Sequence, residues 1–238
     1  LHTDNFEEVS FGPILYGAKK LGMHIHTRYE VSNNAGQDIC DIVNNEGFDF
    51  LLVGSGISMS DSPDDIAATR YRTSFYNRYF KRFKAPESWF YPGALLKDKT
   101  KMFIARSNCD VGVFINRNFV KATNTLVVIS SEEDLFLLDY TRTLLKATHG
   151  SVGIVAKMST TTPGHDQILK ELWDFVSSIP QTQLLPDKDL TPGLFNSYNF
   201  MLIGYNTWND VSEHRKEALQ KMPSTLILNK NRRSSSDN

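Results

Sequence analysis

The sequence predicts an α/β fold, in which helices cover both faces of a parallel sheet. Two runs near the middle of the chain, Val111–Ile115 and Thr125–Ile129, are almost wholly apolar, as strands buried on both faces are. Each run borders a stretch with helical spacing of apolar residues, Lys101–Arg106 before the first and Glu132–Thr148 after the second. We therefore expect one α/β unit to end between the two strands and a second unit to begin there.

The chain before these strands alternates between helix and strand. Apolar residues recur at helical spacing from Phe11 to Leu21 and stop at a glycine. The segment Met23–Val31 alternates in part and predicts a strand, residues 35–45 predict a helix, and Phe48–Val53 predicts a second strand. This order predicts right-handed crossovers in a parallel sheet.

Residues 57–94 interrupt the alternation. Within them, Arg70–Lys84 carries six cations, six aromatic residues and no acidic residue. Pro86, Pro92 and Gly93 argue against a helix directly after it. We interpret 57–94 as an insertion of helices and loops at the edge of the first unit, after which Leu95–Arg106 returns to helix.

The second half repeats the α/β pattern and ends in a polar tail. We expect strands at Thr125–Ile129, Val152–Ala156, Phe200–Ile203 and Thr225–Leu228, and helices at Glu132–Thr148, His165–Ser178 and Asn209–Lys221. The segment Pro180–Ser197 is poorly defined by its pattern. Residues 231–238 are too polar to pack, and we predict a disordered tail there.

Two matching motifs indicate an internal duplication. DFLLVG at Asp49–Gly54 corresponds to NFMLIG at Asn199–Gly204, and each is followed by a helix and a short strand. We predict two tandem lobes, 1–120 and 121–230, that meet near Asn116–Asn124. The first half lacks a counterpart of residues 125–156, and the chain opens with Leu1, so we expect a fragment whose first lobe is truncated at its amino end.

Composition narrows the functional classes. The net charge of −1 favours neither nucleic acid nor an acidic partner. Two cysteines make no disulfide framework and are typical of a reducing compartment. No apolar run approaches the roughly 18–20 residues needed to span a bilayer.

Most of the chain resembles a known family. A strand that ends in glycine, followed by a helix and a short strand, is similar to the closing module of universal-stress-protein domains. The order of the segments resembles the cytosolic C-terminal region of monovalent cation/proton antiporters of the large bacterial, fungal and plant branch. The segments that carry it are DFLLVG, DKTKMFIARSNCDVGVFINRNF and NTLVVISSEEDLFLLDYTRTLLKATHGSVGIV.

The resemblance implies a regulatory tail of two fused stress-protein-like lobes on the cytoplasmic face of a membrane. Its partners would be the transmembrane antiporter domain of the same polypeptide and, since such transporters are usually dimeric, a second copy. The transporter would exchange K⁺ or Na⁺ for H⁺. The family's transport residues lie in membrane helices that this chain does not contain, so no catalytic residue is carried over and we expect no enzyme activity.

A free-standing nucleotide-binding protein of the stress-protein class is the alternative. Many such domains bind ATP through a loop with the spacing Gly, two residues, Gly, nine residues, Gly and Ser or Thr. The candidates for such a loop are Gly54, Ser55, Gly56 and Gly204, but the next glycine after Gly56 is Gly93, and none follows Gly204. The family's aspartate after the opening strand is also replaced, by SSE at 130–132. We therefore expect turn glycines and no cofactor.

Other chemistry has little support. His24 and His26 share a strand face, but a metal site needs three or four ligands, so we expect a solvent-facing pair and no metal. Cys40 and Cys109 are expected to be inert core thiols. The acids at 132–134 are expected to face a helix amino end. An α/β enzyme with its site at the strand carboxyl ends remains a third hypothesis, without a motif.

The basic and aromatic stretch is the candidate contact surface. Its cations could remain solvated while the aromatic residues pack on the domain, or they could contact the anionic inner leaflet or the transporter. Nucleic acid is disfavoured by the near-neutral net charge. The residues proposed for this contact are Arg70, Arg72, Arg78, Lys81, Arg82 and Lys84. We also expect self-association through an unpaired sheet edge in the first lobe.

Overall fold

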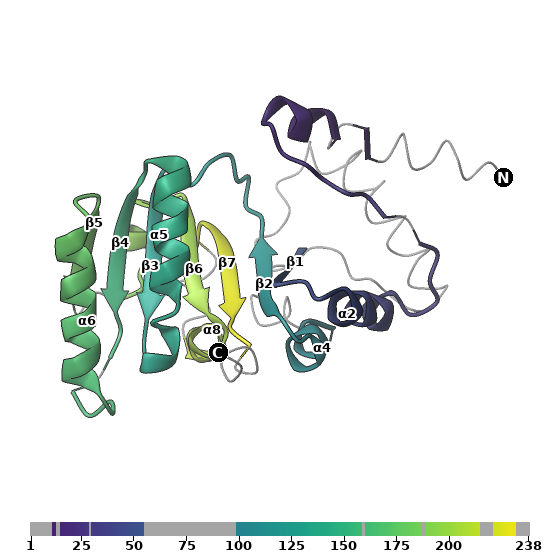
Figure 1. Cartoon of the computed structure of the whole chain (residues 1–238). Coiled ribbons are helices and arrows are strands. Elements are labelled where there is room, and N and C mark those ends of the chain that lie inside the picture. The colour runs from purple at the N-terminus through teal and green to yellow at the C-terminus, as the bar shows by residue number, and fades with distance from the viewer. Residues whose placement is uncertain are drawn as a thin grey trace, which may run out of the picture. The chain divides into compact units, whose positions relative to one another are not determined.

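The computed structural model describes residues 11–12, 15–28, 30–54, 99–158, 160–186, 189–214 and 221–231 of the 238 (Figure 1). The chain divides into two compact units, Leu1–Ala35 and Gly36–Asn238. The helices are α2 (Ala35–Glu46), α4 (Lys99–Arg106), η3 (Glu132–Asp134, a 3₁₀ turn), α5 (Leu137–Thr148), α6 (His165–Ser178), α7 (Pro192–Phe195) and α8 (Tyr205–His214). The strands are β1 (Phe50–Gly54), β2 (Asp110–Ile115), β3 (Asn124–Ile129), β4 (Ser151–Ala156), β5 (Thr182–Pro186), β6 (Phe200–Gly204) and β7 (Ser224–Asn229).

The second unit is built on a single seven-stranded sheet with the order β1-β2-β7-β6-β3-β4-β5. Every neighbouring pair is parallel except β2 and β7, which are antiparallel. Figure 1 shows the arrows of these two strands pointing in opposite directions. The expected α/β fold with a mostly parallel sheet is confirmed.

Helices cover both faces of the sheet, as the apolar strands require. The cluster on one face takes Leu126 and Val128 from β3 and packs them with Trp208 of α8 and Phe195 of α7. Alternate residues of the same strand turn to the other face, where α5 and α6 cover them. All of β6 is buried, and only the first residue of β3 is exposed. These two strands form the centre of the core.

Strand pairing is symmetric about the junction of β2 and β7. β1 pairs with β2 in the same register in which β6 pairs with β7, so the matching motifs Asp49–Gly54 and Asn199–Gly204 occupy equivalent places. Val113 lies opposite Ile227 at the centre of the antiparallel pair. Val113 of β2 and Ile227 of β7 hold equivalent places in the two parallel pairings, so the pattern of strand pairing is the same on both sides of this point.

The central strands predicted from the sequence do not form a hairpin. β2 and β3 are separated in the sheet by β7 and β6, although only residues 116–123 connect them along the chain. Both halves of the chain contribute strands to this one sheet, so the sheet does not divide the chain into two lobes. The lobe boundaries at 120 and 230 therefore stay predictions. Asn231 is the last residue of the tail that the structure describes.

Three segments differ from expectation. The described residues of Met23–Val31 form no strand; Met23 and Val31 are exposed, and none of the described residues pairs with this segment. The poorly defined segment Pro180–Ser197 contains β5 and α7, because β4 offers β5 a parallel partner. The helix after β6 begins at Tyr205, four residues earlier than its apolar spacing indicated.

Helices α2 and α4 pack on β1 and β2. Cys40 and Phe103 are buried with Val111 in a small cluster. The side chain of Asn44 joins α2 to the turn after α4, since its Nδ2 donates to the Arg106 carbonyl (2.8 Å) and its Oδ1 accepts from the Asn108 amide (2.7 Å). The Asn44 side chain thus provides hydrogen-bond partners for a carbonyl and an amide group at the end of α4, where the helix itself provides none.

The two equivalent strands predict unequal costs for the same substitution. Leu202 of β6 is 2% exposed, whereas Leu52, at the equivalent place in β1, is 58% exposed. Leu202→Ala should lower the free energy of unfolding by about 2–5 kcal/mol because it leaves a cavity. Leu52→Ala should lower it by less than about 1 kcal/mol. Urea unfolding of both variants measures the difference, and equal losses would contradict the burial assigned to β6.

Candidate functional site

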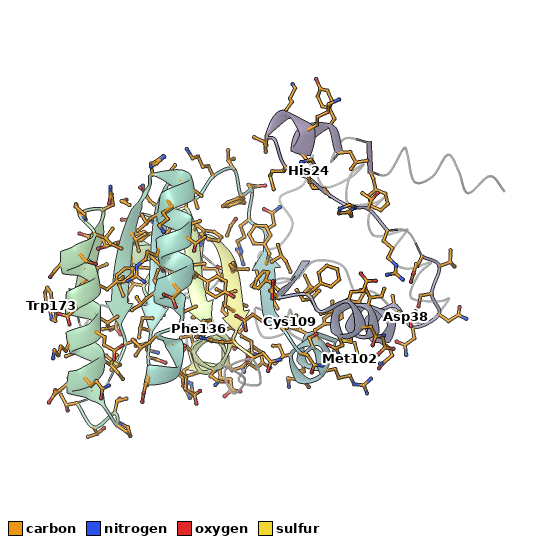
Figure 2. All side chains as sticks on the ribbon, in the orientation of Figure 1. His24, Asp38, Met102, Cys109, Phe136 and Trp173 are labelled. Atoms are coloured by element: carbon orange, nitrogen blue, oxygen red, sulfur yellow. The ribbon has the colours of Figure 1, made fainter. Side chains whose placement is uncertain are left out.

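A cavity of about 590 Å³ opens at the carboxyl edge of the sheet. β3, β6 and β7 run parallel and end at this edge, where open α/β sheets bind their ligands. Residues at the three strand ends and directly after them form its walls. They are Glu132, Glu133, Asp134, Leu135, Phe136, Asp139, Gly204, Tyr205, Asn206, Leu228, Asn229, Lys230 and Asn231. Figure 2 labels Phe136, just before α5.

Asp134 lies at the base of this cavity and is only 2% exposed. Its Oδ2 accepts hydrogen bonds from the backbone amides of Ser130 (2.8 Å) and Ser131 (3.2 Å). The Ser130 hydroxyl (3.1 Å) and the Thr207 hydroxyl (2.6 Å) donate to the same oxygen. Hydrogen bonds to a carboxylate are stronger than those between neutral groups. The Asp134 carboxylate therefore connects the end of β3 to α8.

β6 passes into α8 without a loop. Gly204 ends the strand and Tyr205 begins the helix, so a residue without a side chain precedes the first helical turn. A Cβ atom at Gly204 would overlap Oδ1 of Asp134. Asn206 in the first turn donates through Nδ2 to Oε2 of Glu133 (2.8 Å). Two carboxylates of η3 thus lie beside the amino end of α8, where the helix dipole favours negative charge, and they contact it through the side chains of Asn206 and Thr207.

The cavity is acidic. Its walls carry four carboxylates and one ammonium, that of Lys230, which leaves a net formal charge of −3. Asp139 forms an ion pair with Arg142 at 3.1 Å on the surface of α5. Like charges repel an incoming anion, so this lining disfavours phosphate groups.

A second carboxylate, that of the partly buried Asp110, supports the wall beside β7. Tyr140 of α5 donates its hydroxyl to Asp110 Oδ2 (2.8 Å), and the amide of Asn231 donates to Asp110 Oδ1 (2.7 Å). The Asn231 side chain also donates to the carbonyl of Ser107 (3.0 Å). Burial, this hydrogen bond and the charge of Asp110 raise the pKa of Tyr140. The bonds hold the segment after β7 against β2 and α5.

One of the candidate residues expected from the sequence lies at this site. Gly204 lines the cavity, while Gly54 ends β1. Ser55 and Gly56 lie outside the described residues. So do the six cations proposed for the contact surface, Arg70, Arg72, Arg78, Lys81, Arg82 and Lys84.

Neither the two histidines nor the two cysteines singled out in the sequence line the cavity. His24 and His26 are exposed, and the described part of the chain holds no group of three or more His, Cys, Asp or Glu residues placed for a metal ion. Cys40 and Cys109 are buried and free, and burial raises the pKa of both thiols. Figure 2 shows Cys109 directly before β2.

The acids 132–134 lie at a helix amino end, as their sequence predicts, but their contact with α8 could not be predicted from local spacing. Asp134 caps its own turn through Ser131, as expected, and also contacts Thr207, which lies 73 residues further along the chain. Two features of the sequence could have indicated this contact. Acidic residues follow the apolar strand β3, and a glycine ends the apolar strand β6 directly before a helix.

The fold is similar to that of universal stress proteins. A universal stress protein from Archaeoglobus fulgidus DSM 4304 matches with a TM-score of 0.51 and 11% identity over 98% of this chain and 82% of that chain. A functionally unknown protein from Pseudomonas aeruginosa PAO1 matches with a TM-score of 0.47 and 10% identity over 94% and 78%. No family model and no curated protein matches the sequence. At this identity the likeness shows the fold alone.

Across the ranges that the structure describes, no helix combines the length and the apolar character that a membrane crossing needs.

The two equivalent glycines allow a matched test of the contact between Gly204 and Asp134. Gly204→Ala should lower the free energy of unfolding by about 1–3 kcal/mol, because its Cβ would displace the Asp134 carboxylate. Gly54→Ala should change it by less than about 0.5 kcal/mol, since no atom lies within 4 Å of a Cβ there. Chemical unfolding of both variants decides the matter. A tolerated alanine at Gly204 would show that Asp134 does not lie against it.

The raised pKa of Tyr140 predicts a loss of stability in alkali. The folded state holds this proton more tightly than the unfolded state, so the stabilisation is complete below the unfolded pKa of about 10 and is lost as the pH rises through the folded pKa. The free energy of unfolding should fall above about pH 10, with at most about 1.4 kcal/mol per pH unit for this proton and less because Tyr140 is half-buried. In Tyr140→Phe, the part of the fall in unfolding free energy with pH that comes from this proton should be absent. Urea unfolding between about pH 9 and 11 compares the two proteins, and parallel curves would argue against the assignment.

Proposed function

We propose that this chain is a regulatory interaction domain without catalysis, in which a universal-stress-protein-like fold no longer serves as a nucleotide receptor. The observation that carries the proposal is the junction of β6 and α8. The helix begins at the residue after Gly204, so this junction has no glycine-rich loop to surround phosphates. The Asp134 carboxylate lies at this junction instead.

We further propose that the domain belongs to the cytosolic region of a monovalent cation/proton antiporter. The support is the sequence resemblance described above, which is most detailed over residues 95–156, the part of the chain that runs from α4 to β4. Its main partner would be the transmembrane antiporter domain of the same polypeptide, with a second copy and the anionic membrane surface as further partners. Contact with that surface would use the cations of Arg70–Lys84, each contributing about 1 kcal/mol.

The size of the cavity favours one competing function. A volume of about 590 Å³ lies in the range of small-molecule sites, so a free-standing nucleotide-binding protein is the second candidate. The acidic lining and the missing phosphate loop argue against it. The two functions differ in a property that is simple to measure, which is the affinity of the chain for ATP.

Calorimetry with ATP and AMP tests the first part of the proposal. We expect no saturable heat at ligand concentrations up to about 1 mM, because the amino end of α8 is already beside two carboxylates. A dissociation constant tighter than about 10 µM, equivalent to about −7 kcal/mol, would establish the nucleotide-binding alternative. The buffer should contain no inorganic phosphate, because phosphate would compete with the nucleotide if the alternative function held.

The coding sequence upstream of Leu1 tests the antiporter context independently. We expect about a dozen apolar segments of roughly 20 residues each in the same reading frame. A reading frame that starts within a few codons of Leu1 would contradict the antiporter assignment, while the non-catalytic interaction domain would still stand.

A further inference from the structure

We propose that Asp134, supported by Glu133, is an internal ligand of this domain. By this we mean that the carboxylates of the η3 turn occupy the anion-binding position at the amino end of α8 and so make the carboxyl-edge cavity reject phosphate and similar small anions. This inference rests on the proposed function and names the residues that determine which ligands the cavity excludes.

The position that Asp134 occupies suits an anion. α8 is a helix of ten residues, and its first turn carries the amide groups that have no partner within the helix. These groups and the helix dipole favour negative charge just beyond the amino end. Gly204 directly precedes the helix and can supply no side chain to cap it. An anion that binds at this end of α8 must therefore come from another segment of the chain or from solvent.

Asp134 is held at this position from two sides. The amides of Ser130 and Ser131 bind its Oδ2 from the turn after β3, and the hydroxyl of Thr207 binds it from the third residue of α8. Its Oδ1 lies against Gly204 so closely that no Cβ fits between them. The carboxylate is 2% exposed. An external anion could not reach the same place without displacing it.

Glu133 extends the same arrangement toward solvent. It is exposed, and its Oε2 accepts from the Asn206 side chain at 2.8 Å in the first turn of α8. An approaching phosphate would therefore meet one carboxylate at the rim of the cavity and a second one at its base. Lys230, the cation in the lining, is exposed.

Glu132 provides a matched control. It belongs to the same turn, lines the same cavity and carries the same charge, but it is exposed, and the contacts with α8 described above come from Glu133 and Asp134. Glu132→Gln changes the charge of the cavity as much as Asp134→Ser does. It leaves the amino end of α8 occupied. The two variants separate a general charge effect from the removal of the internal ligand.

Calorimetry with inorganic phosphate, at constant ionic strength, tests the inference on the full chain. Wild type and Glu132→Gln should show no saturation up to about 10 mM phosphate. Asp134→Ser should bind phosphate at least about tenfold more tightly than wild type, because it frees the position and removes its charge. Glu133→Gln, which keeps the buried carboxylate, should gain only about threefold. Circular dichroism confirms that each variant is folded.

Three results would overturn the inference. They are saturable phosphate binding by wild type, a folded Asp134→Ser variant with no gain, or an equal gain in Glu132→Gln. If Asp134→Ser does not fold, an unchanged affinity in Glu133→Gln decides against it. If Asp134→Ser shows no increase in phosphate affinity and wild type does not bind ATP, this inference is wrong but the proposed function still holds. Binding of ATP by wild type contradicts that function itself.

Discussion

The buried carboxylate of Asp134 joins the end of β3 to the start of α8, and the arrangement of the carboxyl edge depends on this joint. Three of its four hydrogen-bond donors come from Ser130 and Ser131, and the fourth comes from Thr207. A buried carboxylate that lost these partners would pay the full cost of desolvation. The same contact requires glycine at 204, because Oδ1 occupies the space of a Cβ atom. One side chain thereby determines both the start of α8 and the base of the cavity.

The antiparallel pairing of β2 with β7 explains why the two halves of the sheet differ in burial. It joins two parallel sets of strands, so that each of the matching motifs lies one strand away from the junction. β6 has neighbours on both sides and is buried throughout, whereas β1 has one neighbour among the described residues and leaves Leu52 exposed. Equal sequence patterns thus have unequal environments, because burial is decided by the neighbours of a strand and not by its own residues.

The elements could be predicted where the pattern was local. The apolar runs predicted β2 and β3, and the repeated phenylalanine-to-glycine motif predicted the equivalence of β1 and β6. The partner of β2 could not be predicted, because strand order is set by contacts between distant segments. At the site, Gly204 was singled out by its position after a strand, but its partner Asp134 lies 70 positions earlier and reaches it only in the folded sheet. Met23–Val31 alternates like a strand yet has no pairing partner in the described chain.

A double-mutant cycle on Asp134 and Thr207 measures the joint most directly. Asp134→Asn removes the charge with little change of shape, and Thr207→Val removes the donor that α8 contributes. If the carboxylate connects β3 to α8 as described, the free energies of unfolding should show a coupling of about 1.5–3 kcal/mol, the range of hydrogen bonds to charged groups. A coupling below about 0.5 kcal/mol would mean that the two residues act independently, and the account of the carboxyl edge would be wrong.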